Sequence, residues 1–335
     1  MKTHFSKFFI PILLFACGAE LSAQQTSRGM VASGTNAEKV VSEEGLHSDV
    51  EFISDTLFHG RAIGSKGANE IAFWLTRRFT ETGLRPMNGS MVKSFTTADG
   101  TVGRNIVGFQ PGRRTGSKEM YVIVAAHYDS HGEIDGRIYP GADNNASGVA
   151  ALVSLARMFS KMESLGRLYG KNLIFVATDG GEKNSAGAEA LMADIKAGVL
   201  KDPVSGRPVT LDKIHSAVVL DILGSSLAPV SKGREDFLIM LSGGQYTFDL
   251  ARANEGKGLG LELATNYYGS KNFTDMFLNR VGDQRVFASA GLTHVLFTSG
   301  ITMRTNKVSD TIDTINFGIL RKRIFLIFHW LEKIL

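Results

Sequence analysis

Histidine and acidic side chains follow apolar stretches at several places along the chain. His127 and Asp129 come after the stretch MYVIVAA, and Asp143 lies in the segment GADNNASG. Glu182 closely follows the stretch LIFVAT, and Asp221 directly follows AVVL. Because the carboxyl ends of parallel strands meet at one edge of a sheet, we expect these five side chains to surround one crevice. One imidazole and several carboxylates suit a zinc-like divalent ion, so the sequence predicts a metal site there.

Each of these signals has a simpler explanation when it is taken alone. The residues HYDS can form a turn, and GADNNASG is typical of a loop that leads into the first turn of a helix. Asp221 can cap the element that follows it. Their common position after apolar strands favours one shared site over several unrelated turns.

The segments between these residues alternate between helical and strand-like patterns. Residues 68–84 place apolar side chains on one face of a helix, and residues 148–162 also read as a helix. A long helix is predicted from about Phe317. Short apolar runs predict strands at residues 120–126, 173–177, 217–220, 237–241 and 294–297. This alternation predicts a mostly parallel sheet with helices on both faces.

The composition is that of an ordinary folded protein. With 335 residues and 43% hydrophobic content, the chain can bury one large core or two smaller ones. It has no Pro/Gly-rich linker, so we expect a single domain over residues 45–335. The net charge of +4 is not clustered, which argues against a nucleic-acid partner. Cys17 is the only cysteine, so no internal disulfide can form.

The first 23 residues have the pattern of an export signal. Two lysines precede the apolar run at residues 8–16, and LSAQ offers a cleavage site after Ala23. This run is too short to span a bilayer as a helix, so we expect no transmembrane segment. We expect export to the periplasm or the exterior, with residues 24–44 as a polar leader. LFAC also resembles a lipoprotein signal ending at Cys17, but Phe15 is unusual there and favours simple secretion.

From about Leu46 to its end, the chain resembles the zinc aminopeptidase family that includes bacterial leucyl aminopeptidase, aminopeptidase Y and glutaminyl cyclase. The resemblance rests on several motifs, among them GRNIVGFQPG, VAAHYDSHG, YPGADNNASGVAALVSLAR, IFVATDGGEKNSAGAEAL, VVLDILG and NKVSDTIDTINF. The block GADNNASG, placed after HYDS, is the most specific of them. The fold that the resemblance implies is a three-layer α/β/α sandwich around a mostly parallel mixed sheet, of the phosphorylase/hydrolase-like zinc exopeptidase type.

The resemblance also implies a two-metal site. Asp143 would bridge both ions, and His127 and Asp221 would complete the first. Glu182 would complete the second ion together with a late histidine. Asp129 would accept the other ring N–H of His127 and so orient it. A cis peptide bond is expected between Asp143 and the next residue.

The chain departs from the family pattern at two important positions. Gly181 stands where the family has the glutamate that acts as general base, which leaves Glu182 as the possible surrogate base. Asn306 stands where the family has a metal-binding histidine, and a neutral amide is a weaker zinc ligand than imidazole. Gly282 and Gln284 are lesser departures, in place of a serine and a histidine. We therefore expect one bound zinc ion rather than two.

Two functions follow from this pattern. The first is a secreted zinc-dependent metallo-exopeptidase that acts on peptide or protein N-termini, with its activity impaired or rebuilt around one metal. The second is a non-catalytic pseudopeptidase that binds peptides or a protein partner in the retained cleft. A general base typically contributes about a hundred- to ten-thousandfold to the rate, so its absence keeps the second function open.

Overall fold

The computed structural model describes residues 34–114, 116–242 and 244–335. The predicted export signal, its cleavage site and Cys17 lie outside these residues. In the part of the chain that is described, we find no helix whose length and apolar content would let it cross a membrane.

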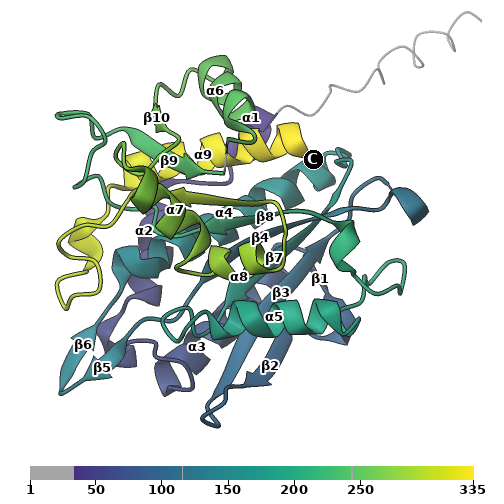
Figure 1. Cartoon of the computed structure of the whole chain (residues 1–335), viewed down its shortest axis with the longest axis horizontal. Helices are drawn as coiled ribbons and strands as arrows, with labels where there is room; N and C mark the ends of the chain where they lie inside the picture. The colour runs from purple at the N-terminus through teal and green to yellow at the C-terminus, as the bar shows by residue number, and fades with distance from the viewer. Residues whose placement is uncertain (1–33, 115, 243) are drawn as a thin grey trace, which may run out of the picture.

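A mixed sheet, nine-stranded within the described residues, runs through the centre of the molecule (Figure 1). Its order is β1-β3-β7-β4-β8-β11-β9-β10, with β2 also paired to β3. Four neighbouring strands are parallel to one another: β7 (Asn172–Thr178), β4 (Tyr121–His127), β8 (Ile214–Leu220) and β11 (His294–Thr298). Their carboxyl ends therefore reach the same edge of the sheet.

The outer strands run in both directions. β3 (Val102–Gln110) is antiparallel to β7 and pairs on its other side with β1 (Arg85–Pro86) and β2 (Val92–Thr96). At the opposite side, β9 (Phe237–Leu241) is antiparallel to β11 and parallel to β10 (Glu262–Ala264). A separate two-stranded sheet consists of β5 (Gly132–Ile134) and β6 (Arg137–Tyr139).

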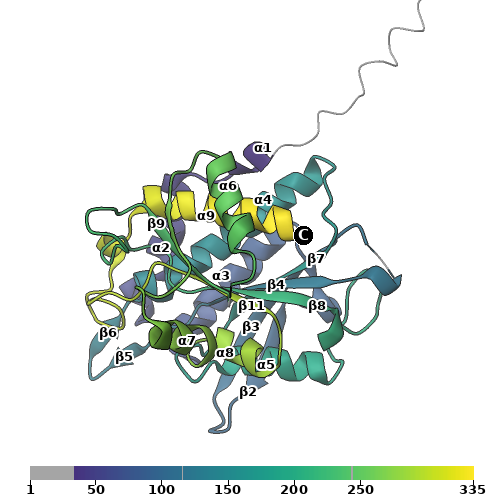
Figure 2. The ribbon, with the colours of Figure 1, turned by 45° about the horizontal axis from the view of Figure 1, so that its top comes forward.

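Helices cover both faces of the sheet, as Figures 1 and 2 show. Alternate residues of β4 point to opposite faces, so Val122 and Val124 enter one apolar core while Tyr121 and Ile123 enter the other. The first core is closed by α1 (Gly34–Glu38), α2 (Glu43–Ile53), α3 (Lys66–Glu81), α4 (Gly148–Ser164), α6 (Thr247–Gly256) and α9 (Phe317–Ile334). The second is closed by α5 (Ala186–Lys196), α7 (Lys271–Asn279) and α8 (Gln284–Ser289). The predicted α/β/α sandwich is confirmed.

Most predicted elements form within a few residues of their expected bounds. The helix predicted at residues 68–84 is α3, which begins at Lys66 because the Ser65 hydroxyl caps it by accepting the Ala68 N–H. The polar leader is shorter than predicted. Helix α1 lies inside it, and Ala37 and Val41 are buried in the core, so the folded part begins before residue 45.

Candidate functional site

His127 is the last residue of β4, and Asp129 holds its ring in place. Asp129 Oδ1 lies 3.2 Å from His127 Nδ1, the geometry predicted for the residue that orients the ring. The same carboxylate accepts the backbone N–H groups of Gly181 at 2.7 Å and Glu182 at 3.0 Å. His127 Nε2 faces Asp221 Oδ1 at 3.7 Å. Burial lowers the pKa of His127, but Asp129 and Asp221 outweigh it and raise that pKa well above its ordinary value.

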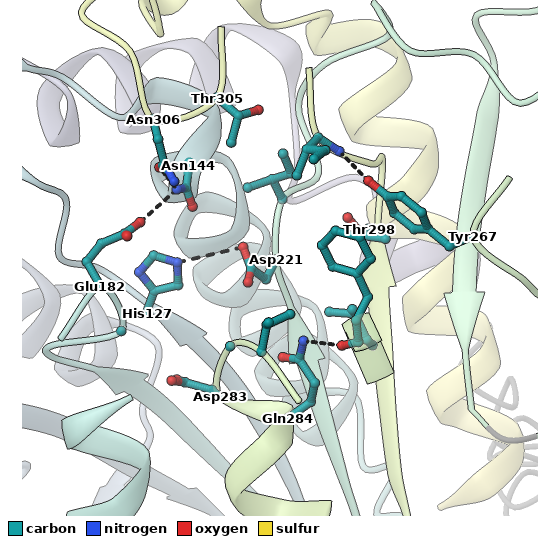
Figure 3. A pocket seen from close by; sticks show the side chains of 17 residues that line it. His127, Asn144, Glu182, Asp221, Tyr267, Asp283, Gln284, Thr298, Thr305 and Asn306 are labelled. Atoms are coloured by element: carbon teal, nitrogen blue, oxygen red, sulfur yellow. Dashed lines mark hydrogen bonds and ion pairs between the residues drawn. The ribbon is translucent and has the colours of Figure 1, made fainter. Parts of the chain in front are cut away.

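A cavity of about 230 Å³ opens at the carboxyl ends of the parallel strands (Figure 3). Four of the residues predicted as metal ligands line it, namely His127, Glu182, Asp221 and Asn306. The crevice expected at the carboxyl ends of parallel strands therefore exists, and it gathers side chains from the end of β4, from the segments after β7 and β8, and from the late loop around Asn306.

Asp143, predicted to bridge two metal ions, does not line this cavity. Its Oδ1 accepts the backbone N–H groups of Gly224 at 2.8 Å and Ser225 at 3.2 Å. Burial, and then the nearby charge of Asp310, raise the pKa of Asp143 to about 7. The following residue, Asn144, lines the cavity instead. The predicted cis peptide is likewise one bond away, because it joins Asn144 to Asn145.

The side-chain amide of Asn144 connects Glu182 and Asn306, which both line the cavity. Its Nδ2 donates to Glu182 Oε1 at 2.7 Å and to Asn306 Oδ1 at 2.5 Å (Figure 3). The other carboxylate oxygen of Glu182 lies 3.4 Å from His131 Nε2. Burial raises the pKa of Glu182, against the opposing effect of the two histidines beside it. Glu182 is thus held by hydrogen-bond donors of the protein itself.

Gly181 has no room for a side chain in this arrangement. A Cβ atom built at this position would lie 2.4 Å from Cγ and 2.6 Å from Cβ of His127. Separations this short require the imidazole or the loop to shift. The His127 side chain therefore occupies the space that any residue larger than glycine needs at position 181, and that includes the general-base glutamate expected from the resemblance.

The sequence from residue 105 to residue 331 matches the profile of Peptidase family M28. This match covers more than half of the chain. The chain belongs to peptidase family M28. The resemblance predicted from the HYDS and GADNNASG motifs is therefore confirmed, and so is the fold that it implied.

Solved structures with the M28 fold include zinc aminopeptidases. The LapA aminopeptidase of Legionella pneumophila superposes with a TM-score of 0.68 and 13% identity, over 92% of this chain and 77% of that chain. BSAP, a zinc aminopeptidase from Bacillus subtilis, superposes with a TM-score of 0.66 and 14% identity, over 88% of this chain and 95% of that chain. Identities this low show a common fold.

A curated relative is more similar over a shorter stretch. The BOS complex subunit ncln of Danio rerio is 39% identical over 121 residues, which are 34% of this chain and 20% of that protein. The chain thus spans about a fifth of the length of this relative.

The zinc ion that M28 aminopeptidases bind does not fit the side chains present here. Among the described residues, no group of three or more His, Cys, Asp or Glu side chains is arranged to hold a metal ion. The amide of Asn144 presents N–H donors to Glu182, and a neutral amide is a weaker zinc ligand than a carboxylate. The predicted zinc site on His127, Asp143 and Asp221 is therefore not supported, since His127 and Asp221 line the cavity and Asp143 does not.

Part of the cavity wall was not predicted. Tyr267 and Phe277 form an aromatic side of it and come from α7 and the turn before it, where no sequence motif marks them. His131, which contacts Glu182 but does not line the cavity, was also missed, although its position four residues after His127 was a visible signal. Asp283 and Gln284 line the cavity, whereas the sequence marked the segment around them only as a departure from the family pattern.

Proposed function

We propose that this chain is a non-catalytic member of peptidase family M28 that uses the retained cleft to bind a polypeptide partner. The observation that carries this proposal is the amide of Asn144, which bonds both Glu182 and Asn306. In this arrangement the protein's own N–H groups satisfy the carboxylate that would otherwise bind a metal.

The lack of space at Gly181 supports the same proposal. A general base has to lie within hydrogen-bond reach of the proton that it removes. Position 181 has no side chain, and the His127 ring fills the space beside it. Glu182, the predicted surrogate, accepts a hydrogen bond from Asn144 and faces His131, so both of its oxygens are engaged.

The partner-binding part of the proposal is supported by analogy. The relative from Danio rerio is named as a subunit of the BOS complex, so at least one M28-like segment serves in an assembly. We also propose that residues 1–23 direct export, which would place the partner in the periplasm or outside the cell.

An impaired metallo-exopeptidase acting on N-termini is the second candidate. It is favoured by the gathering of His127, Glu182 and Asp221 around one cavity, because a small rearrangement of the Asn144 amide would leave three ligands, one imidazole and two carboxylates, facing each other. In that case Glu182 would remove the proton from the attacking water.

A turnover measurement separates the two candidates. We would supply the purified protein with zinc and aminoacyl-nitroanilide substrates that have a free amino group, and assay a Glu182→Gln variant beside it. We expect no hydrolysis above that of the variant. Hydrolysis that disappears in the variant would contradict the proposal and establish the exopeptidase.

A further inference from the structure

Two buried oxygen atoms in the wall of the cavity have no hydrogen-bond partner among the residues that the structure describes. Asp283 and Gln284 are 2% and 1% exposed, and both line the cavity (Figure 3). Asp283 Oδ2 accepts the Thr178 hydroxyl at 2.5 Å, and Gln284 Nε2 donates to the Phe277 carbonyl at 2.6 Å. These bonds fix both side chains, yet Asp283 Oδ1 and Gln284 Oε1 lack a partner among the described residues. Buried acceptors are normally satisfied, so these two indicate a ligand with N–H or O–H groups.

The charges around the cavity indicate that this ligand is a cation. The three acids Asp221, Glu182 and Asp283 line it against one imidazole, that of His127, and among its described lining residues there is no lysine or arginine. Among the described residues, the one ion-pair partner of the Asp221 carboxylate is the imidazole of His127, at 3.7 Å. A group that combines positive charge with several donors can satisfy these oxygens together.

The aromatic wall favours a planar cation. The rings of Tyr267 and Phe277 stack with their centroids 4.1 Å apart, and Phe273 lies edge-on to Tyr267 at 6.5 Å. A guanidinium group packs its flat face against aromatic rings and directs five N–H donors outward in its plane, whereas an ammonium group is a compact point charge.

The size and the rim of the cavity favour a side chain of a larger molecule. Its volume of about 230 Å³ lies below the range of about 300 to 1,000 Å³ that is usual for pockets that enclose a whole small molecule. Ile301 and Val281 line the mouth, and they are 53% and 37% exposed. Met303, two residues further along, is 93% exposed. Exposed apolar side chains around a polar cavity are typical of a surface that another protein covers.

We propose that this cavity receives an arginine side chain of a partner polypeptide, with the apolar rim packing against the residues that flank that arginine. The inference rests on the proposed non-catalytic role and names the chemistry of the partner. Asp221, Asp283 and the Gln284 amide oxygen accept the guanidinium N–H groups. The stacked pair of Tyr267 and Phe277 forms the aromatic wall against which its flat face packs.

Short synthetic peptides test this directly. Each is acetylated at its amino terminus, amidated at its carboxyl terminus, and carries one central arginine between leucine and valine residues. A second peptide has citrulline in place of the arginine, which keeps the shape and removes the charge. We expect fluorescence anisotropy to show at least about tenfold tighter binding of the arginine peptide.

Two variants at opposite ends of β8 provide the matched comparison. Asp221→Asn, directly after the strand, should remove most of the preference for arginine over citrulline. Asp212→Asn, exposed just before the strand, should keep it. Ile301→Ser at the rim should weaken both peptides alike. Circular dichroism of each variant confirms that it is folded.

The outcomes separate this inference from the proposed function. Equal affinity for arginine and citrulline, no binding of either peptide, or an unchanged preference in Asp221→Asn would overturn the inference. So would binding that requires a free amino terminus, because the occupant would then be a chain end. Hydrolysis of the aminoacyl substrates would instead overturn the proposed function, whatever the peptides show.

Discussion

Asn144 donates its amide N–H groups to Glu182 and Asn306 at the position where we had expected a bridging carboxylate to face the cavity. Asp143, one residue earlier, is turned toward the backbone N–H groups of Gly224 and Ser225. A difference of one residue therefore decides whether this loop presents a metal ligand or a hydrogen-bond donor.

Replacing Asn144 by aspartate tests whether the Asn144 amide takes the place of a metal ligand. The change removes the donor and places a second carboxylate beside Glu182, so we expect the free energy of unfolding in chelator to fall by about 1 to 3 kcal/mol. Added zinc should recover that loss, because the variant has gained a charged ligand. Urea unfolding with chelator and with zinc measures both effects. Asn184→Asp, exposed in the same loop as Glu182, is the control and should respond to neither. If zinc did not change the stability of Asn144→Asp, the proposed role of the Asn144 amide would be contradicted.

Gly181 gives a second test at this scale. A methyl group there would overlap the His127 ring, so Gly181→Ala should lower the free energy of unfolding by about 1 to 3 kcal/mol. In a His127→Ala background the same change should cost little, since the overlapping ring is gone. Urea unfolding of the four proteins measures this coupling. Gly256→Ala is the control, because its added Cβ would meet no described residue within 4 Å apart from its chain neighbours and its own helix backbone. Equal costs in both backgrounds would show that the ring does not limit position 181.

At the scale of elements, Asp129 joins the end of β4 to the loop that follows β7. One carboxylate lies beside the His127 ring and accepts the N–H groups of Gly181 and Glu182. Because β4 and β7 are parallel neighbours, this side chain can reach across from one strand end to the next. These contacts keep the loop against the cavity.

We expect Asp129→Asn to loosen this loop. An asparagine side chain has one acceptor oxygen instead of two, so one of the two backbone N–H groups loses its partner, at a cost of about 1 to 3 kcal/mol. Hydrogen exchange at Gly181 and Glu182 should become faster, while exchange in the centre of β4 stays slow. Unchanged exchange at both amides would mean that the loop is held by other contacts.

The pH dependence of stability should reflect the titration of Asp179, which directly follows β7. Burial, and then the nearby charge of Asp129, raise the pKa of Asp179 to about 7. Because the folded state binds this proton more tightly than the unfolded state, stability should fall as the pH rises from about 4 to about 7. Asp179→Asn removes the titrating group, and its oxygen can still accept the Arg104 N–H. Relative to the wild type, the variant should therefore gain stability across this range. Parallel stability curves from urea unfolding at several pH values would refute this assignment.

For the whole molecule, the sequence predicted the sheet and the crevice but not the interior of the site. Apolar strands that end in polar residues are a strong signal, and they correctly brought His127, Glu182 and Asp221 to one edge. The sequence could not predict which way the Asp143 side chain points. The loop around Asp143 has irregular backbone angles, so neighbouring side chains there point to different sides. The sequence could not predict the aromatic wall either, since the packing of α7 is what brings Tyr267 and Phe277 to the cavity.

We expect this M28 fold to keep its cleft without binding zinc. Titration of zinc into chelator-treated, dialysed protein, followed by calorimetry and by elemental analysis after a second dialysis, tests it most directly. For the wild-type protein we predict no saturable heat and far less than one zinc ion retained per chain. The Asn144→Asp variant should retain more zinc. One or two zinc ions held tightly by the wild-type protein would contradict this expectation.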